Sequence, residues 1–111
     1  GYIFTKLEGT FTTLADSTGD FKYHIGLYGG YIEPTVNNTR IVKIPFGELK
    51  AAVSASKTPQ VHLMVDVLKF LNGSGTNLQF KDNSSIMGAN QSLSKMVADN
   101  YAQMFTVDHI H

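Results

Sequence analysis

The hydrophobic pattern of the chain changes its period once, and this change limits the folds that the chain can adopt. Between residues 21 and 28 apolar and polar side chains alternate, which places one set on a single side of a strand: Phe21, Tyr23, Ile25 and Leu27. From residue 92 the apolar residues recur at helical spacing instead: Leu93, Met96, Val97, Tyr101 and Met104. The sequence therefore predicts a mainly β or α+β fold with one C-terminal amphipathic helix, capped by Asn90 or Ser92.

Three further stretches have the composition of strands. Residues 2–8 and 40–46 are rich in β-branched and aromatic side chains, and Pro45 marks the end or an edge of the second stretch. Residues 60–71 carry apolar side chains on both faces, which predicts the longest strand in a central position; a helix over residues 65–71 is the alternative. Together these stretches predict an antiparallel, sandwich-like sheet assembly of about four or five strands.

The composition excludes several classes of protein. The nine basic and nine acidic residues give a net charge of zero, and no basic run occurs, so a nucleic-acid partner is not expected. No apolar run has the length of a bilayer-spanning helix, so we expect no membrane-spanning segment. The chain contains no cysteine, which excludes disulfides, thiolate metal ligands and cysteine nucleophiles.

The length of the chain and its opening residues bear on domain organisation. A chain of 111 residues is expected to form a single domain. The sequence reads as a strand from its second residue, so we expect a piece of a longer chain. Because such a sheet would have unpaired strand edges, we also predict self-association or a disordered margin over residues 1–8.

The C-terminal tail contains two histidines, His109 and His111, separated by one residue. In an extended tail Val107, His109 and His111 share one side, and alternate residues of a strand lie about 6.5–7 Å apart at their Cα atoms. Both imidazoles could therefore reach one metal ion. Two solvated histidines at a frayed terminus are the competing interpretation, and the pattern leaves both open.

Two other stretches offer metal ligands. His62 and Met64 share a strand face, and the combination of imidazole and thioether suits copper, particularly cuprous copper. His24 lies on the polar face of the alternating stretch, opposite the predicted core face. The alternatives are a hydrogen-bonded strand histidine with a core methionine for the first pair, and an exposed strand histidine for His24.

The sequence does not predict an enzyme. Gly73-Ser74-Gly75 lies in a turn and lacks the strand–turn–helix context of a serine nucleophile. The acidic residues have no spacing that selects a catalytic pair, and the glycines at positions 26–30 lack the lysine that follows in a phosphate-binding loop.

Four blocks of the chain resemble, in order and spacing, the C-terminal half of the MbnP-like family: residues 1–9, 21–26, 61–70 and 97–111. The family is named for the partner protein found in methanobactin gene clusters. The Gly-Tyr-Ile-Phe block that opens the chain and the Val-Asp-His-Ile-His block that closes it are the specific ones; Tyr-His-Ile-Gly lies between them. The resemblance is to the lipoprotein-type members found in Bacteroidetes. It implies that residues 1–111 are the C-terminal part of a larger MbnP-like domain.

The resemblance implies a non-enzymatic, copper-binding protein of the periplasm or the outer membrane. In the family a Trp-x-Trp motif precedes the Gly-Tyr-Ile-Phe block, and a dihaem MauG-like partner oxidises the first tryptophan to kynurenine. This chain contains no tryptophan, and Leu27 and Tyr28 intervene before Gly29-Gly30, whereas the family tends to have a glycine pair soon after His-Ile-Gly. A surface or periplasmic β-rich scaffold with incidental histidines is the alternative function.

The resemblance also ranks the metal ligands. His24, in the Tyr-His-Ile-Gly block, is the first choice, followed by His109 and His111 in the tail. His62 and Met64 rank below them, and the portion upstream of this chain is expected to supply a further ligand.

Overall fold

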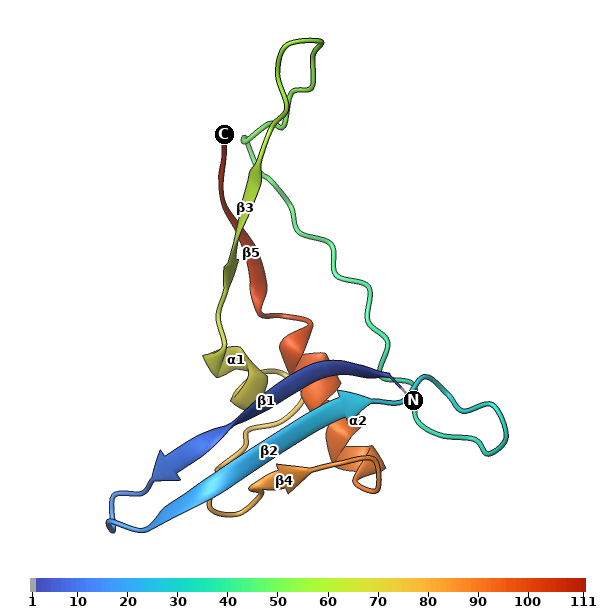
Figure 1. Ribbon diagram of the computed structural model, residues 1–111, viewed down its shortest axis with the longest axis vertical. Helices are drawn as coiled ribbons and strands as arrows, with labels where there is room; N and C mark the ends of the chain where they lie inside the picture. The colour runs from blue at the N-terminus through green and yellow to red at the C-terminus, as the bar shows by residue number, and fades with distance from the viewer. Residues whose placement is uncertain (1) are drawn as a thin grey trace.

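The computed structural model describes residues 2–111, which form two small sheets and two helices. The first sheet has the strand order β1 (Ile3–Thr12), β2 (Thr18–Gly26), β4 (Ser85–Ile86). The second is a two-stranded antiparallel ribbon of β3 (Val61–Val65) and β5 (Phe105–Ile110). The helices are α1 (Leu68–Leu71) and α2 (Gln91–Tyr101). Figure 1 shows α2 beside the three-stranded sheet, while the ribbon extends away from it and gives the molecule dimensions of 53 × 43 × 22 Å.

The β1–β2 hairpin follows directly from its sequence. The chain reverses between Thr13 and Ser17, where the Thr13 N–H donates to the Ser17 carbonyl at 2.8 Å and Asp16 adopts a φ of 59°. The alternation predicted for residues 21–28 is confirmed as far as Gly26, because Tyr23 and Ile25 are fully buried whereas His24 lies on the opposite face. Leu27 is outside the strand, with a φ of 73°, so its predicted place on the core face is wrong. The buried side chains of β2, Tyr23 and Ile25, therefore mark the face of this sheet that the core covers.

The hydrophobic core lies between that face of the sheet and the two helices. It consists of Tyr23, Ile25, Phe70, Leu78, Ile86, Val97, Ala98, Tyr101 and Met104. The ring of Phe70 on α1 stacks against Tyr23 and Tyr101 with centroid distances of 5.7 and 6.4 Å. These rings join the sheet to both helices.

Helix α2 buries a slightly different face from the one predicted. Val97, Ala98 and Tyr101 face the core, whereas Met96 is exposed. Asn90 is the N-cap residue, but its side chain accepts a hydrogen bond from the Met87 N–H instead of capping the helix. The predicted fold class, β or α+β with an amphipathic helix near the C-terminus, is confirmed. Within residues 2–111 neither helix is long and apolar enough to cross a membrane.

Two predicted strands differ in the structure. The stretch at residues 60–71 is not one strand, because β3 ends at Val65 and the chain turns into α1, as the alternative interpretation expected for its second half. The turn forms where the Asp66 carboxylate accepts the Leu68 N–H at 3.2 Å. Residues 40–46 form no strand, because no ladder partner lies beside them among the described residues. Arg40 is instead held by the Asp99 carboxylate.

The predicted sheet arrangement is also modified. The β1–β2 and β3–β5 pairs are antiparallel as expected, but β4 runs parallel to β2, and β3 lies in a two-stranded ribbon rather than in a central position. The ribbon does not stack on the three-stranded sheet (Figure 1). Strand β1 pairs with β2 from Ile3 to Thr12, with an irregularity between Ile3 and Thr5, so the predicted disordered margin is wrong for residues 3–8; Gly1 lies outside the described residues. Self-association, the other alternative, stays a prediction.

One buried polar side chain joins α2 to the turn that follows α1. The Asn100 carboxamide accepts hydrogen bonds from the Gly75 and Thr76 N–H groups at 2.9 and 3.1 Å. It donates to the carbonyls of Phe70 and Thr76 at 3.0 and 2.9 Å. Since Asn100 is fully buried, these four bonds replace the solvent contacts that its carboxamide loses on folding.

Replacing Asn100 with alanine is expected to destabilise the protein by about 2–4 kcal/mol, because two N–H groups and two carbonyls lose their partner in a buried position. Chemical denaturation followed by circular dichroism measures this change. The exposed Asn77 offers a matched control, and Asn77→Ala should change the free energy of unfolding by less than about 0.5 kcal/mol. Equal stabilities of the two variants would contradict the assigned role of Asn100.

Candidate metal centre

The pairing of β3 with β5 contains one irregularity, and it lies at Asp108. His62 pairs with His109, but the next residue of β3, Leu63, pairs with Val107. Asp108 therefore has no counterpart on β3 and forms a β-bulge. Because cross-strand partners share a face, the bulge places Val107 with Leu63 and apart from His109. The prediction that Val107 and His109 lie on one side is therefore wrong.

The bulge gives the ribbon two different faces. One face is apolar and consists of three cross-strand pairs: Val61 with Ile110, Leu63 with Val107, and Val65 with Phe105. The other face carries the pair of His62 and His109, and its end is closed by two backbone hydrogen bonds between Gln60 and His111, at 3.1 and 2.9 Å. Histidines from two distant parts of the sequence thus meet on one face.

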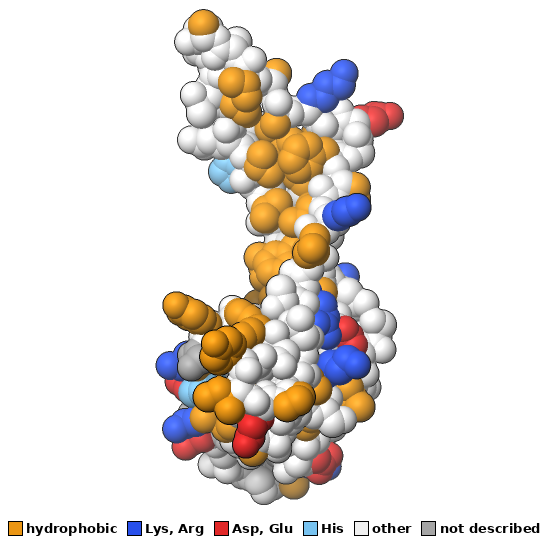
Figure 2. Space-filling view, turned by 90° about the vertical axis from the view of Figure 1, so that its right-hand side faces the viewer, with side chains coloured by type: hydrophobic (Ala, Val, Ile, Leu, Met, Phe, Trp, Pro, Cys, Tyr) orange, Lys and Arg blue, Asp and Glu red, His pale blue; other side chains and the backbone are white. Residues whose placement is uncertain are grey.

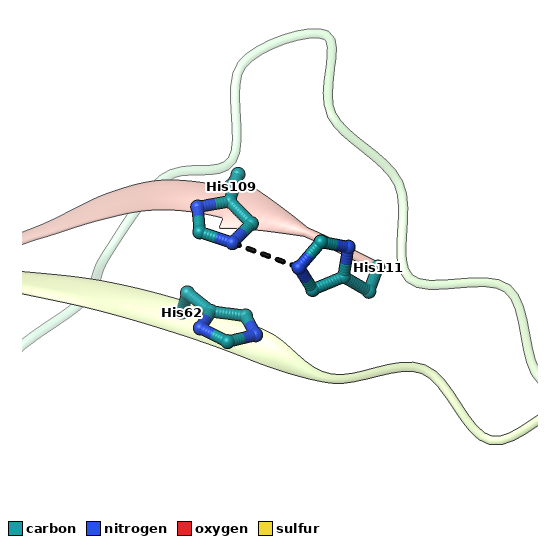
Figure 3. A group of neighbouring side chains, drawn as sticks. All are labelled: His62, His109 and His111. Atoms are coloured by element: carbon teal, nitrogen blue, oxygen red, sulfur yellow. Dashed lines mark hydrogen bonds between the residues drawn. The ribbon is translucent and has the colours of Figure 1, made fainter.

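Three imidazoles converge at this end of the ribbon, as Figure 3 shows: those of His62, His109 and His111. Each offers one nitrogen, and these nitrogens all lie within 4.8 Å of one another. The rings of His62 and His109 stack with centroids 4.1 Å apart and planes 15° apart, and His111 meets both rings edge-on. The Nε2 atoms of His109 and His111 are 3.0 Å apart.

These distances fit ligands of a shared transition-metal ion. Imidazole nitrogens lie about 2.0–2.1 Å from such an ion, so two of them around a tetrahedral centre are about 3.3–3.4 Å apart. The His109–His111 separation of 3.0 Å is close to this value. Separations up to 4.8 Å within the group require a small rotation of a ring before all three nitrogens reach one ion.

Two further features of the group leave nitrogens available to an ion. The Asp108 carboxylate lies 2.6 Å from His109 Nδ1, so Nδ1–H donates to it and the Nε2 lone pair of His109 faces His111. A carboxylate in this position commonly fixes the tautomer of a metal-binding histidine. The Nε2 atom of His62 is buried and has no hydrogen-bond partner among residues 2–111. Coordination to an ion would satisfy it.

The structure does not bring His24 into this group. His24 lies on β2, in the other sheet, where its Nε2 is 2.5 Å from the Glu8 carboxylate on β1. That hydrogen bond, helped by the charges of Lys6, His24 and Lys22, holds the pKa of Glu8 below its ordinary value. A metal-binding role for His24 with other ligands stays a prediction from the resemblance.

Met64 is also separated from the converging nitrogens. It shares a face with His62 and pairs with Thr106, which places it beyond the His62–His109 pair on the side away from His111. The structure therefore unites three of the predicted ligands, His62, His109 and His111, and leaves His24 and Met64 outside.

The sequence alone placed His62 low among the candidate ligands and assigned no role to Asp108. Their importance depends on the strand register, which the local pattern of either strand does not contain. One signal was present, since an acid directly before a histidine is a potential partner for its Nδ1–H.

Comparisons with known proteins agree with the resemblance of the sequence. The model of the MbnP family matches residues 1–90. The matched range includes His62 but ends before His109 and His111, so the tail histidines are supported by geometry rather than by the match. Neither the curated proteins nor the solved structures give a match to this chain.

The His24–Glu8 pair generates a prediction about pH. In His24→Ala the pKa of Glu8 should rise toward its ordinary value, because the hydrogen bond that stabilises the carboxylate is lost. A carboxyl group with a lowered pKa stabilises the folded state above its unfolded pKa, and this contribution disappears as pH falls through the folded pKa. The stability difference between the two proteins should therefore shrink in acid.

Titration of the Glu8 carboxyl carbon by NMR measures this pKa directly. Lys6→Ala serves as the control and should change the pKa less, since the Lys6 ammonium is 3.8 Å from the carboxylate and its effect is the weaker one. An unchanged Glu8 pKa in His24→Ala would contradict the assignment.

Proposed function

The chain belongs to the MbnP family, and on that premise we propose that it is an extracytoplasmic copper-binding protein whose ion is held by His62, His109 and His111. Family membership fits a metal-associated role outside the cytoplasm. The observation that carries the assignment of residues is the convergence of three imidazoles. One of them, His62, has a buried nitrogen without a hydrogen-bond partner within residues 2–111.

The donor set supports copper. Imidazole nitrogen is a good ligand for zinc, copper and nickel, and among divalent ions the intrinsic affinity of such sites is highest for copper. His111 is exposed whereas His62 and His109 are partly buried, so the ion has an accessible side. An accessible side suits a protein that receives and releases its metal. We therefore propose metal handling and not catalysis as the role of the chain.

The resemblance to the family adds a maturation partner and a location to this proposal. A dihaem MauG-like enzyme would act on a tryptophan upstream of residue 1, since the chain itself contains none. The proposed location is the periplasm or the outer membrane, as a lipoprotein.

A second candidate function is a β-rich binding scaffold with incidental histidines. It is favoured by the apolar face of the ribbon, where Val61, Leu63 and Val65 are 43–45% exposed. Figure 2 shows apolar side chains gathered over the projecting part of the molecule. Such exposed apolar surface is typical of proteins that bind a partner. Metal titration separates the two functions.

The three-histidine assignment is tested by copper titration of the chain against a chromophoric chelator. Loss of an outer-shell partner typically weakens metal binding by about 10–100-fold. Replacing His62 with alanine should weaken copper binding further than that, because a direct ligand is removed. His109→Ala and His111→Ala should behave alike. His24→Ala is the matched control and should bind copper as the unaltered chain does. Equal affinities in all four variants would refute the site.

Asp108 gives a second, independent test. Asp108→Ala should weaken copper binding by about 10–100-fold, because the carboxylate no longer holds the Nδ1–H of His109 and its Nε2 is not directed at the ion. NMR of the imidazole nitrogens should show a mixture of His109 tautomers in the variant. A single unchanged tautomer would mean that Asp108 does not orient the ring.

A further inference from the structure

We propose that Gln60 supplies the fourth donor of the metal centre and thereby makes the site selective for a divalent cation. The inference rests on the proposed function and concerns the coordination of the same ion. The backbones of Gln60 and His111 exchange two hydrogen bonds, from the Gln60 N–H to the His111 carbonyl at 3.1 Å and from the His111 N–H to the Gln60 carbonyl at 2.9 Å. They are therefore directly opposite each other.

This pairing places the side chain of Gln60 on the metal-binding face. Gln60 precedes His62 by two residues, and alternate residues of an extended strand share a face. The Gln60–His111 pair and the His62–His109 pair are thus neighbouring cross-strand pairs, or rows, on this face, and the four residues occupy the corners of a rectangle. Rows of this kind are about 6.5–7 Å apart, and the partners within a hydrogen-bonded row are about 5.5 Å apart at their Cα atoms. Three of these four residues, His62, His109 and His111, are the proposed ligands, and Gln60 is the fourth.

An ion held by the three histidines would lie on the side of the His62–His109 row where Gln60 is found. The Nε2 atom of His109 faces His111, away from Asp108. Asp108 is engaged with the Nδ1 atom of His109, and Met64 lies beyond the row on the other side. Gln60 is exposed, so its carboxamide is free to turn toward the three nitrogens.

The chemistry of the fourth donor determines which ion the site prefers. A carboxamide oxygen is a harder ligand than imidazole or thioether and favours divalent ions, whereas cuprous copper favours soft sulfur ligands. Three imidazoles with one oxygen complete a four-coordinate shell, as zinc and cupric copper accept. Gln60 should thus strengthen the binding of cupric copper and zinc without strengthening that of cuprous copper.

The test compares the unaltered chain with Gln60→Ala and Gln60→Glu, each titrated separately with Cu²⁺, Zn²⁺ and, under anaerobic conditions, Cu⁺. Gln60→Ala should bind Cu²⁺ and Zn²⁺ more than about tenfold more weakly, because a direct donor is removed and loss of an outer-shell partner alone costs about 10–100-fold; it should bind Cu⁺ unchanged. Gln60→Glu should bind both divalent ions more tightly. Electron paramagnetic resonance of the Cu²⁺ forms should give three different spectra.

Thr106→Ala is the matched control, because Thr106 is exposed on the same face but lies beyond the His62–His109 row. It should leave all three affinities and the Cu²⁺ spectrum unchanged. Unchanged Cu²⁺ affinity in Gln60→Ala would overturn the role of Gln60 alone, provided that the unaltered chain binds copper and His62→Ala does not. Equal weakening of all three ions would show a structural role for Gln60 and would also overturn it. Absence of metal binding in the unaltered chain would overturn the proposed function together with this inference.

Discussion

The backbone pairing of β3 with β5 is the constraint on which the candidate site depends. The strands are separated by about forty residues of sequence, a distance over which no local pattern sets their register. The bulge at Asp108 shifts the register by one residue, so that His109 pairs with His62 while Val107 stays on the apolar face. Without that extra residue, Val107 and His109 would share one face and the ribbon would lose its division into an apolar and a metal-binding side.

The core of the molecule anchors the base of this ribbon. Strand β5 begins four residues after the end of α2, and the Asp66 N–H that follows β3 donates to the Met104 carbonyl at 2.9 Å. Tyr101 packs beside Phe70, and its hydroxyl donates to the Asn38 carbonyl at 2.6 Å. Burial raises the pKa of Tyr101, so this hydroxyl remains a donor throughout the physiological range. The ribbon therefore projects from a base held by packing and hydrogen bonds, while its far end carries the histidines.

A two-stranded ribbon is marginally stable without a covering layer, and this one leaves its apolar face half exposed. A metal ion held between His62 on one strand and His109 and His111 on the other would connect the strands where the ladder ends. Since such binding occurs only in the folded state, it would also stabilise the pairing. We therefore expect metal binding to be coupled to the pairing of β3 with β5.

The sequence by itself determined the elements whose period is local: the alternation of β2, the amphipathic α2 and the presence of histidines in a tail that becomes β5. It could not separate β3 from α1, because an apolar stretch that is apolar on both faces fits either element. Nor could it show that residues 40–46 lack a ladder partner within the described chain. Only the tertiary structure decided that His62 and not His24 joins the tail, because long-range strand register brings side chains together and no local pattern encodes it.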